Sequence, residues 1–138
     1  MDKSSTPQIC LIDDDRIYQF TAQRIIQLVD PSQKVLVFSN GKEAIDYFSQ
    51  RALSNDQLPD VIFLDINMPV MNGWEFLEAY KTVKRELNKQ ISIYMVSSSV
   101  DEKDKIRSRN FENVKDFIVK PIDKEMMLGI LQSPQAIA

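Results

Sequence analysis

The sequence predicts an α/β protein in which helices cover both faces of one parallel β-sheet. Five short apolar runs alternate with five segments of helical character, which is the pattern of repeated strand-helix units. One run, 61–64, is apolar at every position, as expected for a strand buried on both faces. Parallel strands need crossover connections, and these are almost always right-handed.

Each element has its own signal in the sequence. Strands are indicated by apolar or β-branched runs, and helices mostly by apolar residues spaced three and four apart. The predicted strands are 8–12, 34–38, 61–64, 91–96 and 117–119. Two of the predicted helices span 42–50 and about 101–109, and the other three have apolar faces within 18–29, 76–87 and 127–131. The polar segment 51–59 lacks periodicity and is predicted to be a loop.

Turn signals separate these elements, among them Asp30-Pro31, Asn40-Gly41, Met68-Pro69 and Asn72-Gly73. We expect such a sheet to wind in the flavodoxin-like order 2-1-3-4-5, as a three-layer sandwich with five helices. A length of 138 residues is that of one domain. We expect this domain to span 8–132, between short tails at 1–7 and 133–138.

The composition excludes several classes of function. The sequence has no histidine, which excludes a Ser/His/Asp triad and a histidine-containing zinc site. Its net charge of −3 argues against a nucleic-acid partner. No apolar run approaches the ~20 residues of a membrane span, and Met1 to Pro7 do not resemble a secretory signal. We therefore expect a soluble, cytoplasmic protein, with the single cysteine, Cys10, in its core.

Polar residues follow four of the predicted strands. Asp13 and Asp14 end the first strand, Asp65 the third, Ser97 the fourth and Lys120 the fifth. Ligands of open parallel sheets bind outside the carboxyl ends of the strands, near the point where the winding reverses. The topology should therefore bring three carboxylates, a hydroxyl and an ammonium to one edge of the sheet.

Taken singly, these residues have simpler interpretations. Asp15 and Ser97 could cap helices, Asp65 could begin a turn, and Lys120 could be a solvated loop charge. Several carboxylates at one edge, however, repel each other unless a cation neutralises them. Mg²⁺ fits a site of one or two carboxylates, waters and phosphate oxygens.

The motifs occur in the order found in one family. Apolar strands lead into Asp13-Asp14 and into the segment Asp65 to Pro69, Gly73 follows, and Ser97 and Lys120-Pro121 come after later strands. From about residue 8 to 131 the chain resembles the receiver domain of two-component response regulators, especially the stand-alone type of chemotaxis signalling.

The resemblance implies a role for each matched residue. Asp65 would accept the phosphoryl group and contribute to the Mg²⁺ site. Asp14 would bind Mg²⁺ directly, Asp13 through water, and Asn67 through its backbone carbonyl. Lys120 would pair with Asp65 and then with a phosphoryl oxygen. The donor would be a phosphohistidine on a sensor histidine kinase or on a histidine phosphotransfer protein.

The resemblance also implies a conformational switch. Ser97 would meet the new phosphoryl group, and Phe117 would turn inward behind it. A downstream protein would then bind the face formed by the fourth predicted helix, within 101–109, the fifth strand, 117–119, and the fifth helix, which contains 127–131. The chain departs from the family pattern at three places. Ser97 stands where threonine is commoner, and Phe117 lacks the hydroxyl of a tyrosine. Asn113-Val114 occupy the turn before the fifth strand, where the family often has small residues.

Two other functions remain open. The chain could be a receiver-like interaction module that is never phosphorylated. It could also be a Mg²⁺-dependent aspartyl phosphohydrolase, although such enzymes use a second aspartate as acid/base where this chain has Ile66 and Asn67. Multiple turnover would favour the hydrolase, and one retained phosphoryl group would favour the receiver, which is not an enzyme.

Overall fold

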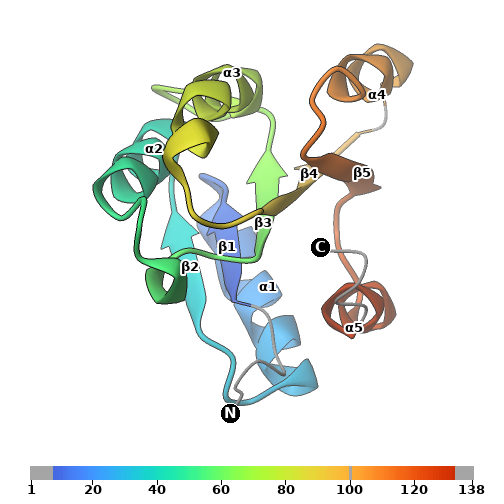
Figure 1. Ribbon diagram of the computed structural model, residues 1–138. Coiled ribbons are helices and arrows are strands. Elements are labelled where there is room, and N and C mark those ends of the chain that lie inside the picture. Colours follow the sequence, from blue (N-terminus) through green and yellow to red (C-terminus); the bar gives the residue numbers. More distant parts are fainter. Residues whose placement is uncertain (1–7, 100, 133–138) are drawn as a thin grey trace.

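Figure 1 shows the computed structural model, which describes residues 8–99 and 101–132. Its five-stranded parallel sheet has the order β2-β1-β3-β4-β5, which confirms the predicted topology. The strands are β1 (Ile9–Ile12), β2 (Val35–Phe38), β3 (Val61–Asp65), β4 (Ser92–Ser97) and β5 (Val114–Val119). The helices are α1 (Arg16–Val29), α2 (Gly41–Gln50), α3 (Gly73–Val83), α4 (Glu102–Ser108) and α5 (Lys124–Leu131).

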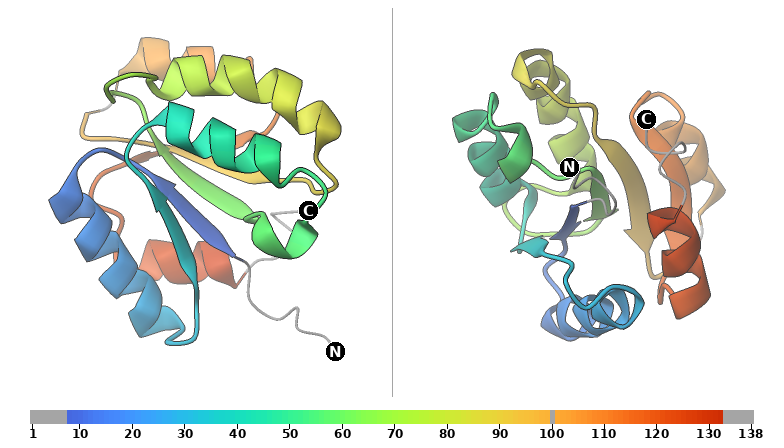
Figure 2. Two further views of the ribbon diagram at one scale, coloured as in Figure 1. Left: turned by 90° about the vertical axis from the view of Figure 1, so that its left-hand side faces the viewer. Right: turned by 60° about the horizontal axis from the view of Figure 1, so that its bottom comes forward.

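The helices form two outer layers around the sheet. Helices α2, α3 and α4 lie on one side and α1 and α5 on the other (Figures 1 and 2). Each layer has its own apolar core: Phe48 and Phe76 belong to the first, and Ile26 and Met127 to the second. The predicted three-layer sandwich is confirmed, and Cys10 is buried in the first core as expected.

The central strand β3 is buried along its whole length, as its uninterrupted apolar sequence predicts. It pairs with β1 on one side and β4 on the other, with Leu64 opposite Ile12 and Asp65 opposite Val96. The carboxyl ends of these strands therefore lie side by side, and Asp65 occupies the middle of that edge.

Polar side chains cap every α-helix. The Asp15 carboxylate accepts hydrogen bonds from the backbone N–H groups of Ile17 and Tyr18, so Asp15 is the N-cap of α1. Asn72 and Glu75 form a capping box at α3. Asp101, not Ser97, caps α4, so the simpler interpretation of Ser97 as a helix cap is wrong.

Several boundaries differ from the sequence prediction. Strand β5 begins at Val114, whereas the sequence predicted a start at Phe117. The prediction was too short because Lys115 and Asp116 are charged and exposed, which is tolerated in an edge strand but interrupts the apolar pattern. Helix α3 ends at Val83 and continues as a 3₁₀ turn, η3 (Lys84–Glu86), so Leu87 lies beyond it. The predicted loop 51–59 contains another 3₁₀ turn, η2 (Asn55–Gln57).

Within the described residues, no helix combines the length and apolarity that a membrane span needs. The tails predicted at 1–7 and 133–138 lie outside the described residues.

Candidate functional site

The carboxyl ends of the strands bring the predicted acidic residues together. Asp13 follows β1, Asp14 comes next, and Asp65 ends β3. Each of the three can offer a carboxylate oxygen, and these oxygens all lie within 4.8 Å of one another. Asp13 and Asp65 are buried, whereas Asp14 is exposed. The cluster thus has a buried base and one solvent-facing carboxylate.

Asp13 is held rigidly at the base of the cluster. Its backbone N–H donates to the carbonyl of Phe38 on β2 at 3.0 Å. Its Oδ1 accepts the backbone N–H of Asp15 at 2.9 Å, and its Oδ2 lies 2.8 Å from Lys120 Nζ. The first contact anchors the backbone of Asp13, and the other two hold one carboxylate oxygen each.

Asp65 occupies the junction between β3 and α3. Its Oδ1 accepts the backbone N–H of Ile66 at 2.9 Å and lies 3.7 Å from Lys120 Nζ. The backbone of Gly73 lies close to that of Asp65 and Ile66, and its N–H donates to the Ile66 carbonyl at 2.8 Å. A Cβ at Gly73 would lie only 2.5 Å from the Asp65 carbonyl oxygen, so this approach requires glycine.

Lys120 connects the last strand to the cluster. Its backbone N–H donates to the Ser97 carbonyl at 2.7 Å, and its peptide bond to Pro121 is cis. The sequence analysis predicted Asp65 as its carboxylate partner before phosphoryl transfer. In the structure the ammonium lies near both buried carboxylates and is closer to Asp13, at 2.8 Å, than to Asp65, at 3.7 Å.

The electrostatics of the cluster are unfavourable without a cation. Burial, followed by the neighbouring charge of Asp13, raises the pKa of Asp65 to about 6, although Lys120 opposes this shift. Burial also raises the pKa of Asp13, against the lowering effect of its contacts with Lys120 and Asp15. One ammonium thus offsets part of the repulsion among three carboxylates.

The donor set fits a hard divalent cation. Carboxylate oxygens are the preferred protein ligands of Mg²⁺, and a divalent charge would balance the two carboxylates left after pairing with Lys120. The exposed Asp14 leaves one side of the cluster open to water and to a ligand. Asn67 is exposed two residues beyond Asp65, and the role of its carbonyl stays a prediction.

The predicted switch residues lie on neighbouring strands. Ser97 is buried at the end of β4, and its Oγ accepts the backbone N–H of Ser99 at 3.3 Å. Phe117 is half-buried on β5 opposite Met95 and packs on the core beneath α2 and α3. Asn113 fits its turn by side-chain hydrogen bonds: its Nδ2 donates to the Ile91 carbonyl at 2.9 Å. The switching roles of Ser97 and Phe117 stay predictions.

Sequence reasoning missed one neighbour of the cluster. In the sequence, Tyr18 is only the first residue of the predicted apolar face within 18–29, yet the centroid of its ring lies 4.4 Å from Lys120 Nζ. A signal was present, because Tyr18 lies in the first turn of a helix that starts beside Asp14. An apolar spacing alone does not distinguish a core residue from one that contacts a charged group.

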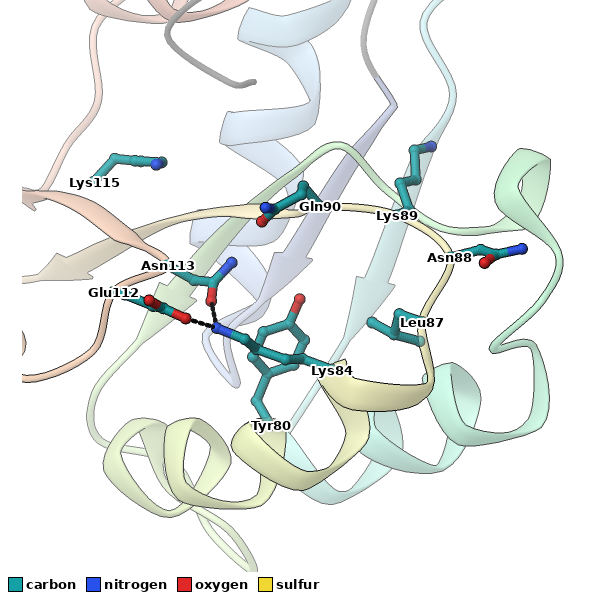
Figure 3. A pocket seen from close by; sticks show the side chains of 9 residues that line it. All are labelled: Tyr80, Lys84, Leu87, Asn88, Lys89, Gln90, Glu112, Asn113 and Lys115. Atoms are coloured by element: carbon teal, nitrogen blue, oxygen red, sulfur yellow. Dashed lines mark hydrogen bonds and ion pairs between the residues drawn. The ribbon is translucent and has the colours of Figure 1, made fainter.

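A cavity of about 550 Å³ lies at the opposite edge of the sheet, before β4 and β5 (Figure 3). Figure 3 shows Lys84 reaching from η3 toward Glu112 and Asn113, with which it forms an ion pair and a hydrogen bond. Lys89 pairs with Asp60 at 3.1 Å. These lysines are therefore engaged by the protein, and the cavity is remote from the acidic cluster.

Comparison with known proteins places the whole domain in one family. Residues 9–132 match the family described as response regulator receiver domain. The chain is 28% identical to protein PilH of Pseudomonas aeruginosa, over 91% of this chain and 95% of PilH. It is 32% identical to protein-glutamate methylesterase/protein-glutamine glutaminase 2 of the same species, over 94% of this chain but only 33% of that protein.

Solved structures agree with the sequence relatives. A two-component response regulator from Cytophaga hutchinsonii has a TM-score of 0.81 and 25% identity, covering 94% of this chain and 96% of that one. A two-component response regulator from Legionella pneumophila has a TM-score of 0.75 and 26% identity, covering 91% and 98%. The chain belongs to the response regulator receiver-domain family and is a receiver domain of two-component signalling.

Proposed function

We propose that this receiver domain accepts one phosphoryl group on Asp65 from a phosphohistidine carried by a sensor histidine kinase or a histidine phosphotransfer protein. The observation that carries the proposal is the position of Asp65, a buried carboxylate at the central strand end, 3.7 Å from Lys120 Nζ and beside Asp13 and Asp14. The chain itself contains no histidine, which agrees with a donor on another chain.

The transfer follows from the arrangement of these groups. An Asp65 carboxylate oxygen attacks phosphorus and forms the new P–O bond, while the P–N bond breaks and its electron pair stays with the departing imidazole. Lys120 turns from the carboxylates to a phosphoryl oxygen and offsets its charge. Such transfers depend chiefly on positioning and charge neutralisation.

We further propose Mg²⁺ as the cofactor of this step, held by Asp14, Asp65 and the Asn67 carbonyl, with Asp13 acting through water. When bound, Mg²⁺ would neutralise phosphoryl charge and orient the oxygens for in-line attack. The family and the acidic donor set support this assignment. Asp13, already fixed by Lys120 and Asp15, would orient the water.

We propose that the phosphorylated domain signals through the face formed by α4, β5 and α5, to which a downstream protein would bind. Each of these elements exposes an apolar side chain: Ile106 on α4 (55% exposed), Val119 on β5 (38%) and Met126 on α5 (42%). Ser97 and Phe117 lie on the strands bordering this face and would couple it to Asp65. A cytoplasmic location stays a prediction.

Turnover separates this function from a phosphohydrolase. We expect wild-type protein with a small phosphodonor and Mg²⁺ to retain one phosphoryl group per chain, without sustained hydrolysis of a phosphate ester. The relevant measurement follows released phosphate and protein-bound phosphoryl group together. Sustained release from a phosphate ester would indicate the hydrolase, and no modification at all would indicate the unphosphorylated interaction module.

A further inference from the structure

Lys120 has a third neighbour besides the two buried carboxylates. Its Nζ lies 2.8 Å from Asp13 Oδ2, 3.7 Å from Asp65 Oδ1 and 4.4 Å from the centroid of the Tyr18 ring. The Lys120 side chain is largely buried. The ammonium is therefore bounded by carboxylates and by an aromatic ring.

The position of Tyr18 is determined by the start of α1. The Asp15 carboxylate accepts the Tyr18 backbone N–H at 3.2 Å, which fixes the first helical turn directly after the acidic pair. The side chain packs against the apolar core that includes Ile9 and Ile122. Helix capping and core packing thus hold the ring independently of Lys120.

The ring itself, not the hydroxyl, makes the contact. The Tyr18 hydroxyl is buried and has no hydrogen-bond partner among the described residues. Burial and the charges of Asp13 and Asp65 raise the pKa of Tyr18, so the ring is neutral at physiological pH. A neutral aromatic face attracts a cation that approaches within about 6 Å of its centroid.

We propose that Tyr18 is a positioning residue for phosphoryl transfer, whose ring confines the Lys120 ammonium between Asp13 and Asp65. This inference rests on the proposed function. Lys120 has a flexible four-carbon side chain, and the ring removes conformations in which its ammonium lies away from the cluster. A cation–π contact also tolerates a small displacement. The ammonium can therefore move from Asp13 toward a phosphoryl oxygen on Asp65 and keep its contact with the Tyr18 ring.

Two variants, Tyr18→Phe and Tyr18→Leu, distinguish the contribution of the aromatic ring from that of the hydroxyl. Tyr18→Phe keeps the aromatic face and removes an unpaired buried hydroxyl, so its phosphorylation rate should match the wild type. Tyr18→Leu removes the face, and its rate with a small phosphodonor should fall by roughly three- to tenfold, the range expected for a partly buried cation–π contact. Mg²⁺ affinity should be unchanged in both variants, because neither change removes a carboxylate.

The contact has a readout independent of phosphorylation. In proton NMR spectra the Lys120 ε-methylene signals should show ring-current shielding in wild type and Tyr18→Phe and lose it in Tyr18→Leu. Tyr18→Met provides a second ring-free variant should Tyr18→Leu fail to fold. In a Lys120→Ala background, Tyr18→Leu should cause no further loss of rate, because its effect acts through the ammonium.

The outcomes distinguish the two proposals. Unmodified wild-type protein would overturn the proposed function, and the positioning role with it. Modified wild type together with an equally fast, folded Tyr18→Leu variant would overturn only the positioning role. A slow Tyr18→Phe variant, or an undiminished Tyr18→Leu effect in the Lys120→Ala background, would also overturn it, because the ring would not then act through Lys120.

Discussion

Asp65 is buried beside a second carboxylate, so its negative charge is costly in the metal-free protein. The same proximity places several oxygens at one point where a cation or phosphoryl group can be bound. Residues arranged for binding often reduce stability in this way, because an unliganded site keeps its like charges together. The cost is measurable as a dependence of stability on pH.

The stability of metal-free protein should rise as pH falls from 7 to 5. The pKa of Asp65 is raised from 3.8 to about 6 by folding, so the folded state binds this proton more tightly than the unfolded chain. The proton that the folded state takes up as the pH falls from 7 to 5 therefore stabilises the fold, by about 1 kcal/mol. Denaturant unfolding across this pH range measures the effect.

Asp65→Asn provides the control for this pH dependence. The variant lacks the titrating group, so it should be more stable than wild type at pH 7, and its stability should change less between pH 7 and 5. Saturating Mg²⁺ should remove much of the difference, since the cation replaces the proton. Equal slopes for the variant and wild type would show that Asp65 does not carry a raised pKa.

Asp14 and Asp15 offer a matched test of metal binding. Asp14→Asn removes a proposed direct ligand and should weaken Mg²⁺ binding at least tenfold in a site with few carboxylates. Asp15→Asn removes the same charge one position later but keeps a competent helix cap, and should change affinity little. Titration calorimetry measures both. Equal losses would mean that net charge, rather than coordination by Asp14, governs binding.

The junction between β3 and α3 determines where Asp65 lies. Gly73 begins α3 in contact with the backbone of Asp65 and Ile66, and the capping box of Asn72 and Glu75 fixes the helix start. In the loop between β3 and α3, Val70 has φ 67°, and the Met71 N–H donates to the Pro69 carbonyl at 2.6 Å. This i to i+2 bond is that of a γ-turn, rare for a β-branched residue.

Gly73→Ala should destabilise the fold by about 1–3 kcal/mol, because its Cβ would lie 2.5 Å from the Asp65 carbonyl oxygen and the backbone would have to move. Gly129→Ala is the matched control. A Cβ at Gly129 on α5 meets no atom within 4 Å, so alanine should stabilise that helix by about 0.5–1 kcal/mol. Chemical denaturation of both variants measures the difference, and similar effects would contradict the close approach at Gly73.

The proposed signalling through α4, β5 and α5 requires phosphorylation of Asp65 to change a surface that Asp65 does not touch. A phosphoryl group adds roughly two negative charges and new acceptor oxygens, which a hydroxyl on the neighbouring strand can satisfy. Ser97 lies at the end of β4, and its carbonyl accepts the Lys120 N–H. A change at Ser97 can therefore reach the end of β5 through this hydrogen bond.

Ser97→Ala should accept the phosphoryl group on Asp65 but lose most of the amide shift changes at residues 101–131 that accompany phosphorylation. The variant removes the hydroxyl that would move toward the phosphoryl group, and only a few kcal/mol are needed to invert a two-state population. Backbone amide NMR before and after phosphorylation measures this. Full wild-type shifts in the variant would exclude the route through Ser97.

The sequence allowed most of the fold to be predicted, because buried parallel strands such as β3 are continuous apolar runs and the turns carry strong signals. Edge strand β5 was shortened in the prediction, since charged Lys115 and Asp116 are tolerated where one side of a strand faces solvent. The left-handed Val70 could not be foreseen, because β-branched residues disfavour that conformation and only the surrounding junction imposes it.

The acidic cluster could be predicted because parallel topology brings strand ends to one edge. The contacts within the cluster could not be predicted. Lys120 lies closer to Asp13 than to Asp65, and Tyr18 lies beside the ammonium. Both contacts depend on side-chain conformations that sequence spacing does not determine.

Intact-mass measurement after treatment with a small phosphodonor tests whether Asp65 is the Mg²⁺-dependent phosphoacceptor. Wild type should gain one hydroxylamine-labile phosphoryl group in the presence of Mg²⁺ and little without it, and Asp65→Asn should gain none. Asp116→Asn, which removes an exposed carboxylate on β5, should behave as wild type. Full modification of Asp65→Asn, or equal modification of wild type without any divalent metal, would contradict the assignment of Asp65 as the Mg²⁺-dependent phosphoacceptor.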